Sequence, residues 1–211
     1  MEGLAKAYRK QRKQIRERLL EFSQVWKGPD EKIFEELCFC FCTPQSNAKA
    51  CFASVDYLAR SGMLIRGDQG IISQHLRGGV RFHNNKSRYI VEARNLFTDH
   101  EGRLRIKERL SHSDPLVIRE WLVSNIKGLG YKEAGHFLRN IGMGDKIAIL
   151  DRHILRNLAK YGAIKEIPPT LTKTRYLEIE EQFRQFSRKV GIPMAELDLL
   201  FWSQETGEIF K

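Results

Sequence analysis

The chain has 211 residues, 42% of them hydrophobic, which is enough for a folded protein with its own core. It carries 36 lysines and arginines against 26 aspartates and glutamates, and the net charge of +10 favours a polyanionic partner. No apolar run approaches the roughly 20 residues that span a bilayer. The N-terminus also lacks the apolar core of a secretory signal, so we expect a cytoplasmic protein rather than a membrane or exported one.

The first 18 residues are basic and have helical spacing. Their charges are Lys6, Arg9, Lys10, Arg12, Lys13, Arg16 and Arg18, and apolar side chains from Tyr8 to Phe22 recur between and beyond them. This pattern predicts an amphipathic helix with a solvated basic face. Direct contact of that face with DNA is the alternative.

The four cysteines lie close together, at positions 38, 40, 42 and 51. Their spacing does not match the paired cysteines of common zinc sites. Because Leu37, Phe39, Phe41 and Phe52 surround them, we predict buried free thiols rather than a metal site. Unpaired thiols are typical of an intracellular protein.

Helical periodicity dominates the rest of the chain, and strand-like alternation never exceeds a few residues. The predicted helices span 34–41, 48–60, 71–76, 87–98, 115–126, 132–141, 152–160, 172–190 and 193–203. Asp114 and Pro115 are a typical cap and first residue of a helix, whereas Pro168 and Pro169 interrupt the chain. The sequence therefore predicts an all-α protein.

The most informative segment is the turn from Ile126 to Lys132, between two predicted helices. Gly128 and Gly130 allow a sharp turn, and the free amides at a turn and helix start can hold a phosphate. Lys132 follows in the first turn of the second helix, and Asp151 lies just before the next helix. A lysine and a carboxylate beside a phosphate suit chemistry on the attached sugar.

These residues resemble the helix-hairpin-helix DNA glycosylases, whose hairpin ends in Gly-hydrophobic-Gly and whose catalytic aspartate lies downstream. Residues 42–47 and 81–86 resemble two further DNA-facing segments of that superfamily. Length and C-terminal sequence are most similar to the archaeal-type 8-oxoguanine glycosylase/lyases. The resemblance covers about residues 30 to 205, and it implies two helical lobes flanking a DNA-binding cleft. Residues 33–135, with the hairpin, would form one lobe, and residues 1–32 plus 136–211 the other.

The resemblance implies that Lys132 attacks the sugar and that Asp151 assists. Glycoside cleavage passes through an oxocarbenium-like state that a carboxylate stabilises. Asp151, as a helix cap, accepts amide hydrogen bonds that keep it ionised. The first turn of a helix disfavours the ammonium form of Lys132, and a neutral amine can add to C1′ and form a Schiff base. An exposed lysine and an ordinary helix cap are the alternatives.

Further roles follow from the same resemblance. The hairpin would bind DNA phosphate through Lys127, Gly128, Leu129 and Gly130. Gln45, Phe82 and His83 would enter the duplex and fill the gap left by an everted nucleotide. Asp198 and Trp202 share a helix face, and we expect them, with the C-terminal Lys211, to recognise the base. Packing in the core is the alternative for Trp202.

The expected function is excision of 8-oxoguanine from double-stranded DNA, with strand cleavage by β-elimination. Oxidised pyrimidines are the nearest alternative substrate, as in endonuclease III relatives, but no cysteine follows Cys51 to hold their iron–sulfur cluster. A non-catalytic DNA-binding protein is the alternative from another class. We expect a monomer with no required cofactor and no metal-ligating side chains. Relatives often hold a structural monovalent cation on the hairpin carbonyls of residues 127–130.

Overall fold

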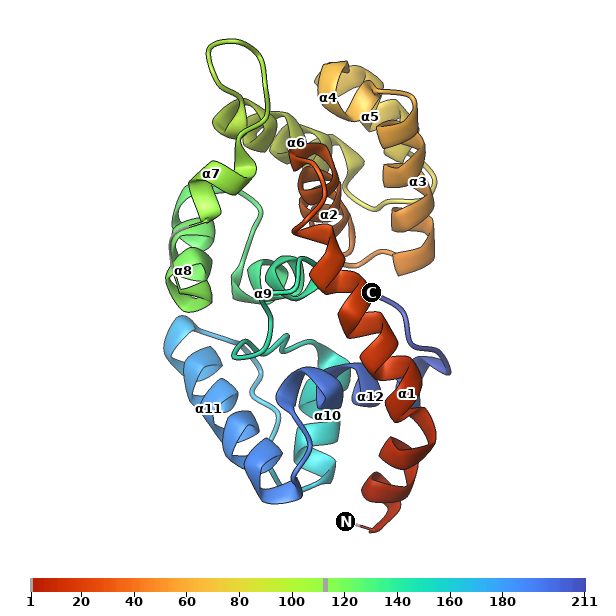
Figure 1. The fold of residues 1–211 in the computed structure, drawn as a ribbon, viewed down its shortest axis with the longest axis vertical. Helices are drawn as coiled ribbons and strands as arrows, with labels where there is room; N and C mark the ends of the chain where they lie inside the picture. The colour runs from red at the N-terminus through yellow and green to blue at the C-terminus, as the bar shows by residue number, and fades with distance from the viewer. Residues whose placement is uncertain (1, 112–113) are drawn as a thin grey trace.

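The computed structural model describes residues 2–111 and 114–211, and these form an all-α fold, as predicted (Figure 1). In this part of the chain, extended pairing is limited to an isolated bridge between Thr98 and Leu104. None of the described helices combines the length and the apolar character that crossing a membrane requires.

The helices follow the predicted order closely. They are α1 (Glu2–Val25), α2 (Asp30–Cys42), α3 (Ala48–Arg60), α4 (Met63–Arg66), α5 (Gln69–Leu76), α6 (His83–Phe97), α7 (Ile106–Leu110), α8 (Pro115–Asn125), α9 (Tyr131–Asn140), α10 (Arg152–Lys160), α11 (Lys173–Val190) and α12 (Met194–Thr206). The short helices α4 and α7 were not predicted, because four or five residues are too few for a periodic pattern. Helix α6 begins four residues before the predicted 87.

Buried apolar side chains form two clusters. One runs from Ile33 to Ile147 and includes the four cysteines, which are buried and free, as predicted. The other joins Leu4–Phe22 of α1 to residues from Ala148 to Phe201. Figure 1 shows α2 to α8 in the upper part of the view, α10 to α12 in the lower part, and α9 between these groups. The exact lobe boundaries at residues 32 and 135 stay a prediction.

The turn before α9 requires glycine at position 128. Gly128 has a φ of +81°, and a Cβ there would lie 2.3 Å from the ring of Tyr89. Gly130 caps the N-terminus of α9, and its amide donates to the carboxylate of Glu133 at 3.3 Å. The chain therefore turns tightly and places Lys132 in the first turn of α9.

The segment before α10 crosses α9 at close range. A Cβ on Gly135 would lie 2.9 Å from the carbonyl oxygen of Ala148, so only glycine permits this approach. The same carbonyl accepts a hydrogen bond from the Tyr176 hydroxyl at 2.7 Å, and the Leu150 amide donates to that hydroxyl at 3.2 Å. These contacts place the start of α10 beside α9.

A buried ion pair connects α8 to α11. The guanidinium of Arg119 donates to both oxygens of Glu180, at 2.6 and 2.8 Å, and the two residues are 2% and 3% exposed. Glu180 also accepts the amide of Ala148 at 2.7 Å. Because water is excluded, neither charge has another partner of comparable strength. The pair thus supports the segment that leads to Asp151.

Arg119→Ala is expected to lower the free energy of unfolding by about 3–5 kcal/mol, because it removes the bidentate partner of the buried Glu180 carboxylate. Only the Ala148 amide and the more distant Arg184, at 3.9 Å, would still face that carboxylate. Urea denaturation followed by circular dichroism measures this loss. Arg175→Ala is the matched control, since Arg175 pairs with Glu178 on the surface; it should cost about 1 kcal/mol or less. Equal losses of unfolding free energy in the two variants would show that the buried pair stabilises the protein no more than the surface pair does.

Candidate active site

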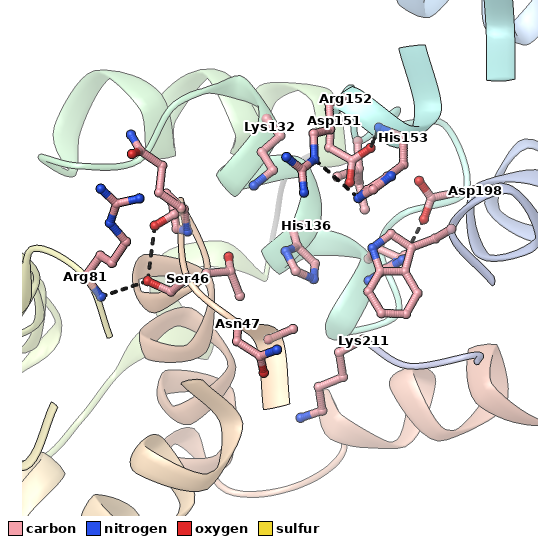
Figure 2. A pocket seen from close by; sticks show the side chains of 17 residues that line it. Ser46, Asn47, Arg81, Lys132, His136, Asp151, Arg152, His153, Asp198 and Lys211 are labelled. Carbon is pink, nitrogen blue, oxygen red and sulfur yellow. Dashed lines mark hydrogen bonds and ion pairs between the residues drawn. The ribbon is translucent and has the colours of Figure 1, made fainter. Parts of the chain in front are cut away.

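A cavity of about 890 Å³ lies where α9, α10, α12 and the segment between α2 and α3 meet. Six residues predicted to act on DNA line it: Gln45, Lys132, Asp151, Asp198, Trp202 and Lys211. Figure 2 shows Lys132, Asp151, Asp198 and Lys211 around a common space, with His136 among them. Residues far apart in the sequence are thus brought together.

Lys132 enters the cavity from the first turn of α9. Its side chain is 27% exposed, and its ammonium lies 3.4 Å from a carboxylate oxygen of the neighbouring Glu133. Arg139 and Lys211 line the same cavity. The concentration of positive charge favours an anionic ligand.

Asp151 caps α10, as predicted. One carboxylate oxygen, Oδ1, accepts the amides of His153 and Ile154, both at 2.8 Å. Among the described residues, no hydrogen bond uses the other oxygen, Oδ2. The cap therefore orients the carboxylate and leaves one oxygen available to a ligand in the cavity.

Asp198 is buried and already has a protein partner. The guanidinium of Arg139 donates to its Oδ2 at 2.5 Å, and the two residues are both 6% exposed. Burial raises the pKa of Asp198 to about 6, while Arg139 acts in the opposite direction. A base that hydrogen-bonds to Asp198 must therefore share the carboxylate with Arg139.

The C-terminus folds into the cavity. The ammonium of Lys211 pairs with Glu36 and lies 4.7 Å from the ring centre of Phe52. Phe210 packs 6.0 Å from Phe52 and 6.5 Å from Trp202, between ring centres. These contacts hold the last residues against the cavity wall, next to a partly exposed indole.

The other predicted residues lie outside the cavity lining. Lys127 is exposed, with its ammonium 3.7 Å from Glu92. The side chain of Leu129 is buried, and its amide donates to the Ile126 carbonyl at 3.3 Å. The Gly130 amide is used by Glu133, so the free amide expected at this position is absent in the described structure.

Phe82 and His83 also lie outside the lining, at the start of α6. Phe82 is 53% exposed and has a φ of +57°. The Nδ1 of His83 lies 2.8 Å from the hydroxyl of Ser73. The exposed phenyl ring is free to contact a partner, whereas His83 is tied to α5.

Several cavity residues were not recognised in the sequence. His136 and Arg139 follow Lys132 by one and two helical turns, so the helical period offered a signal for them. Burial lowers the pKa of His136 well below its usual range, and Arg139, Lys132 and Lys211 act in the same direction. Glu36, which anchors Lys211, carried no such signal, because it lies 175 residues away.

Three comparisons with known proteins agree. The family described as 8-oxoguanine DNA glycosylase matches residues 15–192. An 8-oxoguanine DNA glycosylase/AP lyase from Fusobacterium nucleatum is 46% identical, with 99% of this chain and 96% of that protein covered. The solved 8-oxoguanine glycosylase/lyase of Methanocaldococcus jannaschii, bound to a 15mer DNA containing 8-oxoguanine, is 35% identical. Its TM-score is 0.88, and the alignment covers 100% of both chains.

The buried carboxyl of Asp198 predicts a specific pH dependence of stability. Its pKa in the folded protein, about 6, lies above the ordinary 3.8, so the folded protein binds the proton more tightly. The free energy of unfolding should therefore fall as the pH rises from about 4 to about 6, by up to about 3 kcal/mol from this group. Asp198→Asn should remove that fall, as urea denaturation at several pH values would show.

Asp99→Asn is a control, because the effect of Asp99 on the free energy of unfolding changes with pH in the opposite direction. The Arg103 amide and the Arg105 guanidinium lower the pKa of Asp99, so Asp99 stabilises the protein above its pKa and loses that effect in acid. Identical pH profiles for wild type and Asp198→Asn would contradict the raised pKa of Asp198.

Proposed function

Because the chain belongs to the 8-oxoguanine DNA glycosylase family, we propose that it excises 8-oxoguanine from DNA and then cleaves the strand as an AP lyase. One observation carries the assignment of residues: Lys132 and Asp151 line one cavity, which also holds an aromatic ring and several cations. A nucleophile, an acid and a surface for a flat base are the parts that this reaction needs.

In the first step, the neutral amine of Lys132 attacks C1′ of an everted nucleotide. The C1′–N9 bond breaks, and its electron pair leaves with the base, which then takes up a proton. The Asp151 carboxylate stabilises the positive charge that develops on the sugar. It also accepts the proton that the attacking amine must release.

In the second step, the sugar ring opens and the lysine nitrogen forms a Schiff base with C1′. Loss of a proton from C2′ then breaks the C3′–O3′ bond, and the 3′ phosphate leaves. Water hydrolyses the imine and frees Lys132 for the next turnover. The reaction is redox-neutral and consumes only water, so no cofactor is needed.

We assign recognition of the base to the far side of the cavity. The partly exposed indole of Trp202 offers a stacking surface for a purine. Asp198 and the docked C-terminal Lys211 offer hydrogen-bonding groups of opposite charge, with Asp198 shared by Arg139. A site of this size and polarity suits a flat heterocycle with several donors and acceptors.

We assign the opening of the duplex to Gln45 and Phe82, which are both exposed. Gln45 would hydrogen-bond to the orphaned base, and Phe82 would stack between its neighbours. Phosphate binding is assigned to the exposed Lys127 and the Gly128 amide of the hairpin, because the amides of Leu129 and Gly130 already donate within the protein. His83, tied to Ser73, supports this segment rather than entering the duplex.

The hairpin also fits a monovalent cation. The Gly130 carbonyl accepts the Ala134 amide at 2.9 Å, whereas the carbonyls of Lys127, Gly128 and Leu129 accept no hydrogen bond among the described residues. Carbonyl oxygens suit hard cations, and a cation here would add positive charge near the phosphate. That the protein acts as a monomer stays a prediction.

Lys132→Gln is expected to abolish the covalent adduct that borohydride traps on duplex DNA with one 8-oxoguanine, because an amide cannot form a Schiff base. Asp151→Asn should slow base excision by about 100-fold or more. Denaturing gels measure both results. Lys146→Gln is the control, since this exposed lysine pairs with Asp114 and lies outside the cavity lining, and it should still trap. Undiminished trapping by Lys132→Gln would refute the assignment of the nucleophile.

The choice of base is tested by comparing 8-oxoguanine with thymine glycol in the same duplex. The wild type should excise 8-oxoguanine and leave thymine glycol, because a saturated pyrimidine is not flat and stacks poorly on Trp202. Trp202→Ala should slow excision of 8-oxoguanine by about 10-fold or more and leave cleavage of a preformed abasic site unchanged. Preference for thymine glycol would instead favour a function like that of endonuclease III.

A further inference from the structure

A buried lysine lies beneath the two segments assigned to duplex opening. Lys86 of α6 is 5% exposed, although its segment was expected to face DNA. Its ammonium donates to the carbonyls of Cys42 and Pro44, both at 2.7 Å, and to the hydroxyl of Ser46 at 3.2 Å. An ammonium has three donors, so every donor is used inside the protein.

These contacts tie the end of α2 and the following loop to α6. Helix α2 has no basic residue in its own last turn, and Lys86 supplies the missing cation at the carbonyl end of this helix. Burial lowers the pKa of Lys86. The three hydrogen-bond partners compensate for the burial of the Lys86 ammonium, since an unpaired buried ammonium is strongly disfavoured.

The same residue also reaches the second segment. The backbone amide of Lys86 donates to the Phe82 carbonyl at 3.0 Å. The hydroxyl of Ser46 accepts the Arg81 amide at 2.9 Å as well as the Lys86 ammonium. Residues 42–46 and 81–82 are therefore joined through one buried cation and one hydroxyl.

Each segment carries a strained residue. Gln45 has a φ of +56° and Phe82 a φ of +57°, and these are the positive-φ residues other than glycine in the described chain. Side chains rarely adopt this conformation unless the surrounding structure holds them there. The contacts of Lys86 and Ser46 lie directly beside both positions.

We propose that Lys86 is a positioning residue that holds the Gln45 and Phe82 segments as one preorganised unit for entry into duplex DNA. The proposal rests on the function proposed above. Eversion of a nucleotide requires that the gap be filled as the base leaves. If the two segments are fixed relative to one another, both side chains meet the duplex in register, without an ordering step at the moment of entry.

The test compares two substrates with Lys86→Met, which keeps the length of the side chain but removes its donors. Single-turnover excision from an 8-oxoguanine duplex should slow by about 10-fold or more. Cleavage of a single-stranded oligonucleotide with a preformed abasic site needs no duplex opening, so its rate should stay within about twofold of wild type. Ser46→Ala, which cuts the link to Arg81, should shift the ratio of the two rates in the same direction.

Arg94→Met is the matched control. Arg94 also lies on α6 and donates to two backbone carbonyls, those of Leu64 and Gly67, at 3.2 and 2.8 Å, but it is not among the residues that line the cavity. It should leave the ratio of the two rates unchanged. An equal effect of Lys86→Met on both substrates, no effect on either, or the same ratio in Arg94→Met would overturn the proposal. Failure of the wild type to excise 8-oxoguanine would instead refute the proposed function.

Discussion

The candidate catalytic pair depends on one close packing contact, where the segment before α10 crosses α9 at Gly135. The Ala148 carbonyl would lie 2.9 Å from any Cβ at that position. This crossing brings the N-terminus of α10, with Asp151, to the helix that carries Lys132. The Arg119–Glu180 pair and the hydroxyl of Tyr176 hold the crossing segment from its other side. The candidate active site is thus built by backbone contacts as much as by its own side chains.

The two residues proposed to react are positioned by different means. Lys132 owes its place to a turn that only glycine permits at position 128. Asp151 owes its place to two amides of α10, which orient the carboxylate through a single oxygen. The amine keeps the freedom of a long side chain, whereas the acid is held rigidly. This division suits a reaction in which the nucleophile must follow C1′ as the sugar ring opens.

Local sequence patterns were sufficient to predict much of the fold. Helical periodicity predicted the longer helices, and the Gly-Leu-Gly turn with Lys132 and Asp151 predicted two residues that line one cavity. These signals lie within short stretches of sequence, where propensity and capping act. Two short helices were missed because they are too short for a periodic pattern. The early start of α6 was missed because it depends on tertiary contacts, those of Ser73 with His83 and Asn84.

Contacts between distant residues could not be predicted in the same way. Nothing near Asp198 in the sequence indicates that Arg139 occupies its carboxylate. Lys86 belongs to a polar segment that suggests a DNA-facing surface, yet its ammonium donates hydrogen bonds to three acceptors inside the protein. The docking of Lys211 on Glu36 joins the last residue of the chain to α2. Each of these contacts depends on which helices pack together, and that packing depends on interactions throughout the fold.

The most direct measurement of the central claim is the identity of the amine that bonds to the sugar. The borohydride-reduced complex with 8-oxoguanine DNA would be digested with nuclease and protease, and the modified peptide sequenced by mass spectrometry. The account predicts that the reduced sugar remnant is attached to Lys132. Attachment to Lys86, Lys127, Lys211 or the N-terminal amine would contradict it.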